Sequence, residues 1–498
     1  MLSLEGGSLP GVPKLAFVND IRADLHDPDT VYVALDNHKY GDFSPYLLVS
    51  KNRGRSWKMI TDGIPEKHLV WRLVQDHIRP DLMFAATEFG VFATFDAGAA
   101  WHKLSGGMPT ISLRDIQIQR RENDLVAASF GRGFYVLDDY SALRDINPED
   151  FEVDAALFKP RDADWYFPKR PLGYRPKGSQ GDSLFVADNP AFGAVFTYYL
   201  STSLETREQA RQTSEAEALE SGKSVSFPGW DTVTEESREE EPDVMLTIKD
   251  LQGNVLRRVP AVNQSGLNRV AWDLRRSFEG PVEMGNNWRG DPPTGFMVMP
   301  GTYTAQLIAL HNGQERVLTE PVSFDVKRLR AGALPGGSLE ELEAFTSELS
   351  DLYGKSSAVR YAIRDAREEL DKLATMLERM EQPLAAGSSR IFALRAELFD
   401  IEEIVFGNEL QSGIGGYEPM SVSSWLGHAV RGVSNSSYGP TPSHRQSVAH
   451  ARSVFEPALA RLNRLLQKDL HLLKSDLRNA GAPWTVGEPI VVSAEAAN

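Results

Sequence analysis

The chain has 498 residues, of which 41% are hydrophobic and 24% are charged, a composition that predicts a globular protein of several domains. Its 69 acidic and 53 basic residues give a net charge of −16, which argues against a nucleic-acid partner, because phosphates are bound by basic surfaces. The absence of cysteine excludes disulfides, thiolate metal sites and a cysteine nucleophile. No stretch reaches about 18 consecutive apolar residues, so we expect no membrane span.

One short motif occurs twice near the N-terminus, with its tryptophans 44 positions apart. Both copies fit S/T-x-D/N-x-G-x-x-W, the pattern called an Asp-box. The copies carry Asn52, Gly54 and Trp57, and then Asp96, Gly98 and Trp101. We expect the Asx side chain to cap a tight turn by hydrogen bonding two residues on, the glycine to supply a positive φ, and the tryptophan to pack against a sheet. Such boxes are typical of hairpin turns in β-propeller blades.

Short strands rich in β-branched and aromatic residues surround both boxes and continue to about residue 145. Their blade-like pattern repeats every 43–50 residues, roughly, which is within the range of propellers. We therefore predict that residues 1–148 are the C-terminal blades of a β-propeller. Three blades cannot close a ring, because propellers use about four to eight. We expect either that further blades precede this chain or that another chain completes the arc.

The predicted fold class is thus multidomain and mainly β: a partial propeller, an Ig-like β-sandwich and a C-terminal helical bundle. The Pro- and Gly-rich residues 149–192 are typical of a linker, and strand patterns predict the sandwich at 193–330. A polar insert, residues 203–241, ends in Glu235–Glu241, which contains five acidic residues. Acidic runs of this kind are usually solvated or disordered, so we expect a loop there.

From residue 338 the hydrophobic period changes to that of helices. Apolar residues between Leu342 and Met380 alternate steps of three and four, which is a heptad pattern. Further helices are expected at about 389–406 and 442–479, separated by a Gly/Ser-rich loop (407–440), and Pro457 should kink or start the last one. We predict a helical bundle over 338–480 and a tail over 481–498. The alternative is an intermolecular coiled coil, which would allow self-association through the heptad helix.

Beyond the boxes, five segments carry a resemblance to a known family. They are Pro80–Gly90, Arg120–Leu125, Leu125–Asp139, Gly266–Leu274 and Ala480–Thr485. Together with the boxes, these segments resemble the C-terminal half of bacterial sortilin-type BNR-repeat propeller proteins, which are often labelled glycosyl hydrolase. The resemblance implies a secreted or periplasmic protein, although Met1–Gly7 lacks the basic and apolar regions of a signal peptide.

Propeller ligands usually bind at one face, which includes the loops between the second and third strands of each blade. Aligning Pro28 with Pro80 places Asp36 in register with Glu88 on two such loops. Two carboxylates facing one cleft could serve glycoside hydrolysis as acid and as base or nucleophile. We expect ligand contacts around them from His38, Tyr40, Arg72 and Arg132. The alternative is that both carboxylates pair with Arg72 or Arg132, or cap loops.

The residues therefore leave two functions open. The first is a binding or scaffold protein that recognises a protein, peptide or glycan at the propeller face. The second is a glycoside hydrolase, similar to a xyloglucanase or a sialidase, that uses Asp36 and Glu88; a sialidase would also need an arginine cluster and a tyrosine nucleophile. Carboxyl groups about 5–10 Å apart in an open cleft would favour hydrolysis. The histidines do not fall at metal-ligand spacing, and we expect no metal or cofactor.

Overall fold

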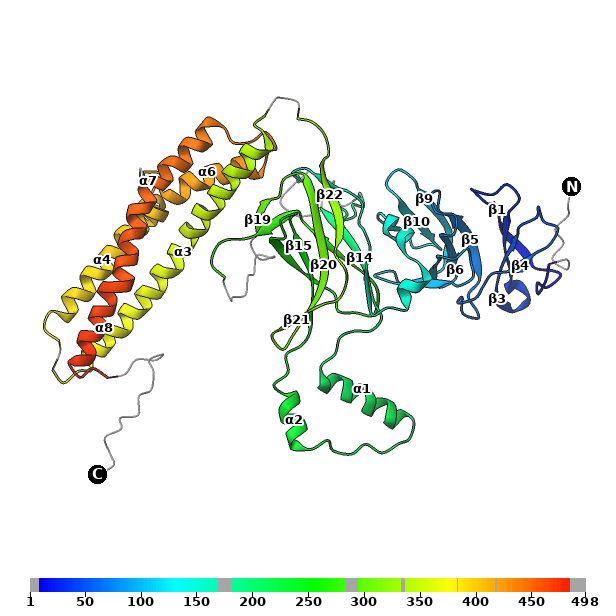
Figure 1. Ribbon diagram of the computed structural model, residues 1–498, viewed down its shortest axis with the longest axis horizontal. Coiled ribbons are helices and arrows are strands. Elements are labelled where there is room, and N and C mark those ends of the chain that lie inside the picture. The colour runs from blue at the N-terminus through cyan, green and yellow to red at the C-terminus, as the bar shows by residue number, and fades with distance from the viewer. Residues whose placement is uncertain are drawn as a thin grey trace. The chain divides into compact units, whose positions relative to one another are not determined.

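The computed structural model describes residues 9–168, 181, 183–282, 294–332, 336–382, 384–416 and 419–483. The predicted mainly β chain with a C-terminal helical region is confirmed (Figure 1). The chain divides into two compact units, one of residues 1–164, 170–273 and 301–327 and one of residues 165–169, 274–300 and 328–498. Most of the predicted tail 481–498 lies outside the described residues. Among the described residues, no helix has the length and apolar character that crossing a membrane requires.

Three antiparallel sheets follow one another at the start of the first unit, and the strand order in each follows the chain. Sheet A contains β1 (Phe17–Ala23), β2 (Val31–Asn37), β3 (Asp42–Ser50) and β4 (Lys58–Met59). Sheet B contains β5 (Val70–Gln75), β6 (Met83–Thr87), β7 (Gly90–Thr94) and β8 (His102–Leu104). Sheet C contains β9 (Leu113–Gln119), β10 (Asp124–Ser129) and β11 (Phe134–Leu137). These eleven short strands occupy the part of the chain, up to about residue 145, where the sequence predicted short strands.

Sheet B lies between sheets A and C. Its first strand, β5, contacts β1 and β2, and β9 contacts β5 and β6 in the same way. All five residues of β6 are buried, because alternate side chains enter different cores. Met83 belongs to the core shared with sheet A, whereas Phe84 belongs to the core shared with sheet C. Strands β6 and β7 are therefore buried on both faces, which is why they appear in the sequence as nearly continuous apolar runs.

The turn after β7 is held by its own side chains. Thr94 Oγ1 accepts the N–H of Gly98 at 2.9 Å, and Asp96 Oδ1 accepts the N–H groups of Ala99 and Ala100, both at 2.9 Å. Ala97 and Gly98 have φ values of 59° and 89°. Two successive left-handed residues bring the later N–H groups to the carboxylate. The prediction that the Asx side chain bonds to the residue two positions later is therefore wrong. Asp96 accepts the N–H groups of the residues three and four positions later.

The turn after β3 repeats this arrangement. Ser50 Oγ accepts the N–H of Gly54 at 2.8 Å, and Asn52 Oδ1 accepts the N–H of Ser56 at 2.9 Å. Arg53 and Gly54 have φ values of 59° and 82°. The two motifs therefore fold into turns with matching hydrogen bonds.

Each motif tryptophan lies on the same side of its own sheet. Trp101 is 3% exposed, packs in the core between sheets A and B, and donates Nε1–H to the carbonyl of Ile60 at 2.8 Å. Trp57 packs on the face of sheet A that points away from sheet B, where Leu9 and Val12 cover Leu48. Trp57 is only partly buried, because the short segment that contains Leu9 and Val12 covers less of this face of sheet A than a whole sheet would.

Two further sheets pack face to face. Sheet D contains β12 (Ala155–Leu157), β14 (Ala194–Leu200) and β17 (Gly266–Trp272). Sheet E runs in the order β13 (Ala163–Trp165), β22 (Val322–Arg328), β20 (Gly301–His311), β15 (Asp243–Lys249) and β16 (Val255–Ala261), and β21 (Gln314–Val317) also pairs with β20. Phe196 and Trp272 of sheet D meet Phe324 of sheet E at 5.0 and 6.0 Å between ring centroids. Strands β12 and β13 lie in the predicted linker 149–192. Three residues each are too few to produce a recognisable period.

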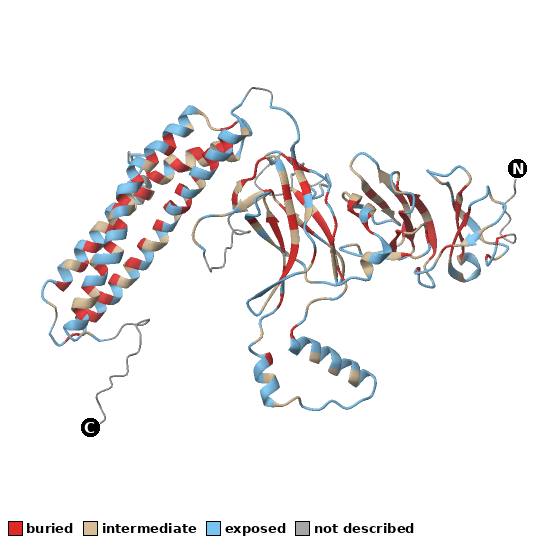
Figure 2. Ribbon diagram, in the orientation of Figure 1, coloured by how far each residue is buried: buried red, intermediate tan, exposed pale blue. Residues whose placement is uncertain are grey.

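The polar insert contains two helices, which corrects the predicted loop only in part, because residues 237–241 of the acidic run lie outside helices. It forms α1 (Arg207–Glu220) and α2 (Trp230–Glu236), both largely exposed (Figure 2). Thr206 and Gln209 form a capping box that starts α1. Arg211 holds Glu236 through two bonds of 2.9 and 2.8 Å, so part of the acidic run is paired rather than solvated.

In the second unit, helices pack around the apolar stripe of α3 (Leu339–Glu378), which is its row of buried apolar side chains. The other helices are α4 (Gly387–Phe406), α5 (Glu409–Gly413), α6 (Val422–Ser434), α7 (Pro442–Arg464) and α8 (Leu470–Asn479), with a π-helical segment at Leu465–Asp469 between the last two. The predicted heptad positions on α3 from Leu342 to Leu377, and Met380 just beyond, are buried within the chain (Figure 2). Self-association through this stripe stays a prediction that would require the helices to separate. Helix α7 continues through Pro457 without starting there.

Helix α6 lies in the stretch predicted as a Gly/Ser-rich loop. Ser421 caps its first turn, and Val422, Leu426, Ala429 and Val433 bury one face at helical spacing. The glycines and serines around these residues concealed that period. The hairpin of β18 (Arg275–Ser277) and β19 (Thr294–Met297) also belongs to this unit.

The contact between α6 and α7 should be sensitive to acid. His444 Nδ1 accepts the N–H of Thr441 at 3.2 Å in the capping box of α7, and the ring of His428 lies 4.9 Å away. Burial and the neighbouring His428 lower the pKa of His444. A protonated Nδ1 cannot accept the Thr441 N–H, and a cation is disfavoured at a helix N-terminus.

Because the folded pKa is depressed, this stabilisation is complete above the unfolded pKa and is lost as pH falls through the folded value. We expect hydrogen exchange in residues 422–450, corrected for intrinsic rates, to accelerate between about pH 7 and about pH 5. His444→Gln keeps an acceptor for the cap and should remove most of this acceleration, whereas His450→Gln should not. Equal pH dependence in all three proteins would refute the assignment to His444.

Candidate functional site

Side chains from sheets A, B and C form one continuous series of contacts, which we call the rim cluster: His38, Trp71, Glu88, Arg114 and Phe130. The edge of the His38 ring meets Trp71 at 5.9 Å between centroids. Trp71 Nε1 donates to Glu88 Oε2 at 2.9 Å. The guanidinium carbon of Arg114 lies 3.6 Å from the Trp71 ring centroid and 4.9 Å from that of Phe130. Phe130 itself is 70% exposed.

A β-bulge occurs at the same place in the first strand of each sheet. Leu35 and Ala34 pair with Val18 and Asp20, so Asn19 is the extra residue in β1. The same shift in register makes Trp71 the extra residue of the bulge in β5 and Arg114 the extra residue of the bulge in β9. Bulges redirect side chains and are frequent next to functional sites. Asn19 also links two sheets, because its Nδ2 donates to the carbonyl of Val70 at 3.1 Å.

Arg114 retains an unused donor. Its Nε is buried and has no hydrogen-bond acceptor among the described residues. The nearest carboxylate oxygen, Glu88 Oε2, lies 3.8 Å from Nη2, which is an ion-pair distance rather than a hydrogen bond. Stacking on Trp71 therefore fixes the guanidinium while leaving it hydrogen-bonding capacity.

Glu88 belongs to the rim cluster, and its partners are not the predicted arginines. Its Oε2 accepts from Trp71 Nε1 and, at 2.9 Å, from Ser112 Oγ. The side chain is 28% exposed, and the nearby cation is Arg114 rather than Arg72 or Arg132. Glu88 is thus held in place and can still be reached by a ligand.

Asp36 is 2% exposed. Its Oδ1 bonds to Nδ1 of His38 and accepts the N–H of His38 at 3.2 Å. Asp36 therefore caps the short 3₁₀ turn His38–Tyr40, in agreement with the alternative of loop capping. A carboxylate so deeply buried cannot touch a ligand, whereas His38, with a side chain 35% exposed, can.

The other predicted contact residues fall into two groups. Arg72 bridges sheets: it donates to Asp20 at 3.1 Å and lies 3.5 Å from Asp115. Tyr40 is 60% exposed and stacks on Phe17 at 6.4 Å between centroids. Arg132 is exposed on the β10–β11 turn, two residues after Phe130. Sequence reasoning missed Arg114, although its position next to Leu113 matches that of Trp71 next to Val70.

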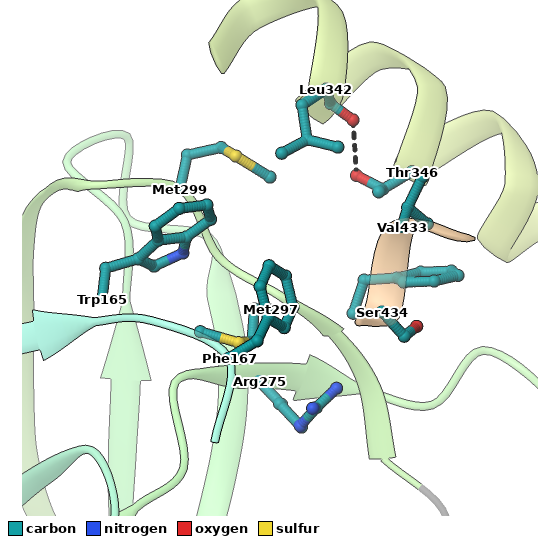
Figure 3. Close-up of a pocket in the computed structure, with 10 residues that line it drawn as sticks. Trp165, Phe167, Arg275, Met297, Met299, Leu342, Thr346, Val433 and Ser434 are labelled. Carbon is teal, nitrogen blue, oxygen red and sulfur yellow. Dashed lines mark hydrogen bonds between the residues drawn. The ribbon is translucent and has the colours of Figure 1, made fainter. Parts of the chain in front are cut away.

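The second unit contains a small apolar cavity of about 10 Å³ (Figure 3). Trp165, Met297, Met299 and Leu342 are among its walls. Thr346 lies at its edge and donates its hydroxyl to the carbonyl of Leu342 at 2.9 Å. A void of this size holds at most one water molecule and, being apolar, is expected to stay dry. It is therefore a packing feature and not a ligand site.

No protein-family model and no curated protein matches this chain. Solved structures similar to it include the extracellular domain of the hybrid two-component system BT3049 from B. thetaiotaomicron (10% identity, TM-score 0.21, 62% of this chain and 32% of that one). Others are an ancestral GH74 enzyme (11%, 0.23, 62% and 36%) and the GH74 xyloglucanase from Xanthomonas campestris (17%, 0.20, 37% and 29%). The matched region thus spans about a third of those chains.

Proposed function

We propose that this chain is part of an Asp-box β-propeller protein that binds a protein, peptide or glycan at the rim cluster. In this proposal sheets A, B and C are neighbouring blades of a BNR-repeat, sortilin-like propeller, sheets D and E are an Ig-like sandwich, and the helices are a scaffold. The observation that carries it is the bulge repeated in β1, β5 and β9, which directs Asn19, Trp71 and Arg114 to one rim. The Arg114 side chain is 38% exposed, which supports a ligand that brings an acceptor to this guanidinium.

Binding is favoured over glycoside hydrolysis by the state of the two carboxylates. Hydrolysis needs one acid and one base or nucleophile, both facing the substrate. Asp36 is buried under its own turn, and Glu88 Oε2 already accepts two hydrogen bonds. The exposed aromatic rings of Tyr40 and Phe130 and the stacked arginine are instead residue types that dominate binding energy at protein surfaces.

Arg114→Gln should weaken ligand binding at least about tenfold, because arginine anchors commonly contribute about 2 kcal/mol or more. We would screen the full chain against arrays of peptides, proteins and polysaccharides, and measure each hit by calorimetry. Arg121→Gln removes an arginine whose side chain is 81% exposed and which, among the described residues, pairs only with its neighbour Glu122, so this variant should bind as the wild type does. Hits that bind equally well to both variants would show that the ligand lies elsewhere.

A further inference from the structure

A large cavity lies in the first unit, between sheet D and the ends of sheets B and C. Its volume is about 950 Å³, near the upper end of the range for small-molecule sites, which is about 300–1,000 Å³. One wall is the face of sheet D that does not pack on sheet E, with Tyr199, Leu267 and Arg269. The opposite wall contains His102 and Leu104 of sheet B and Phe151. None of these residues belongs to the rim cluster.

The apolar part of the cavity is aromatic and fixed. His102 and Phe151 stack at 4.6 Å with an interplanar angle of 19°, and Tyr199 meets Phe151 edge-on at 5.2 Å. The Tyr199 hydroxyl donates to the carbonyl of Phe151 at 3.3 Å. Burial lowers the pKa of His102, so its ring is neutral near pH 7 and provides an aromatic surface. Leu104 and Leu267 rest on the core between sheets B and C while also lining the cavity.

The polar part is basic, although the chain as a whole has a charge of −16. None of the described residues that line the cavity is an aspartate or a glutamate. Arg269 lies at one end, and its Nη1 and Nη2 donate to the main-chain carbonyls of Asp138 and Asp139 at 2.8 and 2.6 Å. The Asp139 carboxylate accepts from Ser141 and lies 3.4 Å from Arg161. A guanidinium has five N–H donors, so these two bonds leave Arg269 able to bind an acceptor.

We propose that this cavity is a second binding site, for a small molecule with a flat apolar body and a carboxylate. The flat body packs against the His102–Phe151–Tyr199 rings and the two leucines. The carboxylate takes further N–H donors of Arg269, since arginine binds carboxylates with high geometric specificity. Such a ligand contacts sheets B and D at once and therefore stiffens the joint between them.

The test uses the full chain and three probes of one shape and different charge: 2-naphthoate, 2-naphthylmethanol and 2-naphthylmethylammonium. We expect calorimetry to show that 2-naphthoate binds at least about tenfold more tightly than the neutral alcohol, and the ammonium most weakly of all. Hydrogen exchange in residues 102–107 and 264–269 should slow in the presence of 2-naphthoate. No binding at millimolar concentrations, or tighter binding of the ammonium, overturns the proposal.

Two variants separate this site from nonspecific apolar binding. Leu267→Trp places an indole where the flat body of each probe would pack and should weaken binding of all three probes, whereas Arg269→Gln should remove only the preference for the carboxylate. Arg258→Gln, which removes an exposed arginine paired with Glu315, should change neither result. Circular dichroism and the thermal transition of each variant establish that it is folded. Unchanged 2-naphthoate binding by folded Leu267→Trp would place that binding elsewhere and refute the assignment.

Discussion

Arg144→Leu should lower the free energy of unfolding of the first unit by about 3–5 kcal/mol, because it leaves a buried carboxylate without its cation. Asp76 is 0% exposed and lies at the end of sheet B, after β5. Arg144 Nη2 donates to Asp76 Oδ2 at 2.8 Å, and the hydroxyl of Tyr140 donates to the same oxygen at 2.6 Å. These bonds attach the segment after sheet C to sheet B.

Urea unfolding of the full chain, followed by hydrogen exchange in residues 70–146, measures this loss. Arg53→Leu is the matched control, because Arg53 and Asp29 form an ion pair whose side chains are 70% and 48% exposed. Exposed pairs contribute about 0–1 kcal/mol, so the control should unfold almost as the wild type does. Equal effects of the two substitutions would show that the Asp76 network does not hold the sheets together.

The same network gives a pH dependence of known sign. Burial alone would raise the pKa of Asp76, but the bonds from Arg144, the Arg79 N–H and Tyr140 outweigh it and lower the pKa to about 2. Because the folded pKa is depressed, the stabilisation is complete above the unfolded value near 4 and is lost as pH falls towards 2. Asp76→Asn should flatten this acid limb of the stability curve.

Trp101→Ala should also lower the free energy of unfolding by about 3–5 kcal/mol. The indole fills the core between sheets A and B, and its removal also leaves the carbonyl of Ile60 without its donor. Trp57→Ala should cost less, because Trp57 is only partly buried on the open face of sheet A. Denaturant titrations of the two variants compare them directly. A larger loss for Trp57 would contradict the view that the second motif joins two sheets.

The periodic parts of this chain could be predicted from its sequence. The strands of sheets A to C form a repeated pattern and the α3 stripe is long. Both patterns can therefore be distinguished from a chance arrangement of apolar residues. Strands β12 and β13 and helix α6 could not be predicted, because three-residue strands have no period and the α6 stripe lies among glycines and serines. In the insert, Arg211 of α1 pairs with Glu236 of α2, and a contact between residues 25 positions apart has no local signal in the sequence.

The candidate site was predicted only in part. The alignment of Pro28 with Pro80 made Glu88 a candidate site residue. It could not show that the Asp36 side chain is buried and accepts the N–H of His38. The bulges at Asn19, Trp71 and Arg114 depend on which residues pair across strands, and no single residue type in the sequence indicates them. The proposal of binding rather than hydrolysis therefore rests on burial and register, not on residue identity.

The most direct test of this account is a hydrolysis assay on wild type and Glu88→Gln in parallel, with aryl glycosides and soluble polysaccharides as substrates and released phenol or reducing sugar as the readout. A binding protein releases neither product from any substrate, and the two proteins give the same blank result. Release by the wild type that Glu88→Gln abolishes would contradict the account and make the rim a catalytic site.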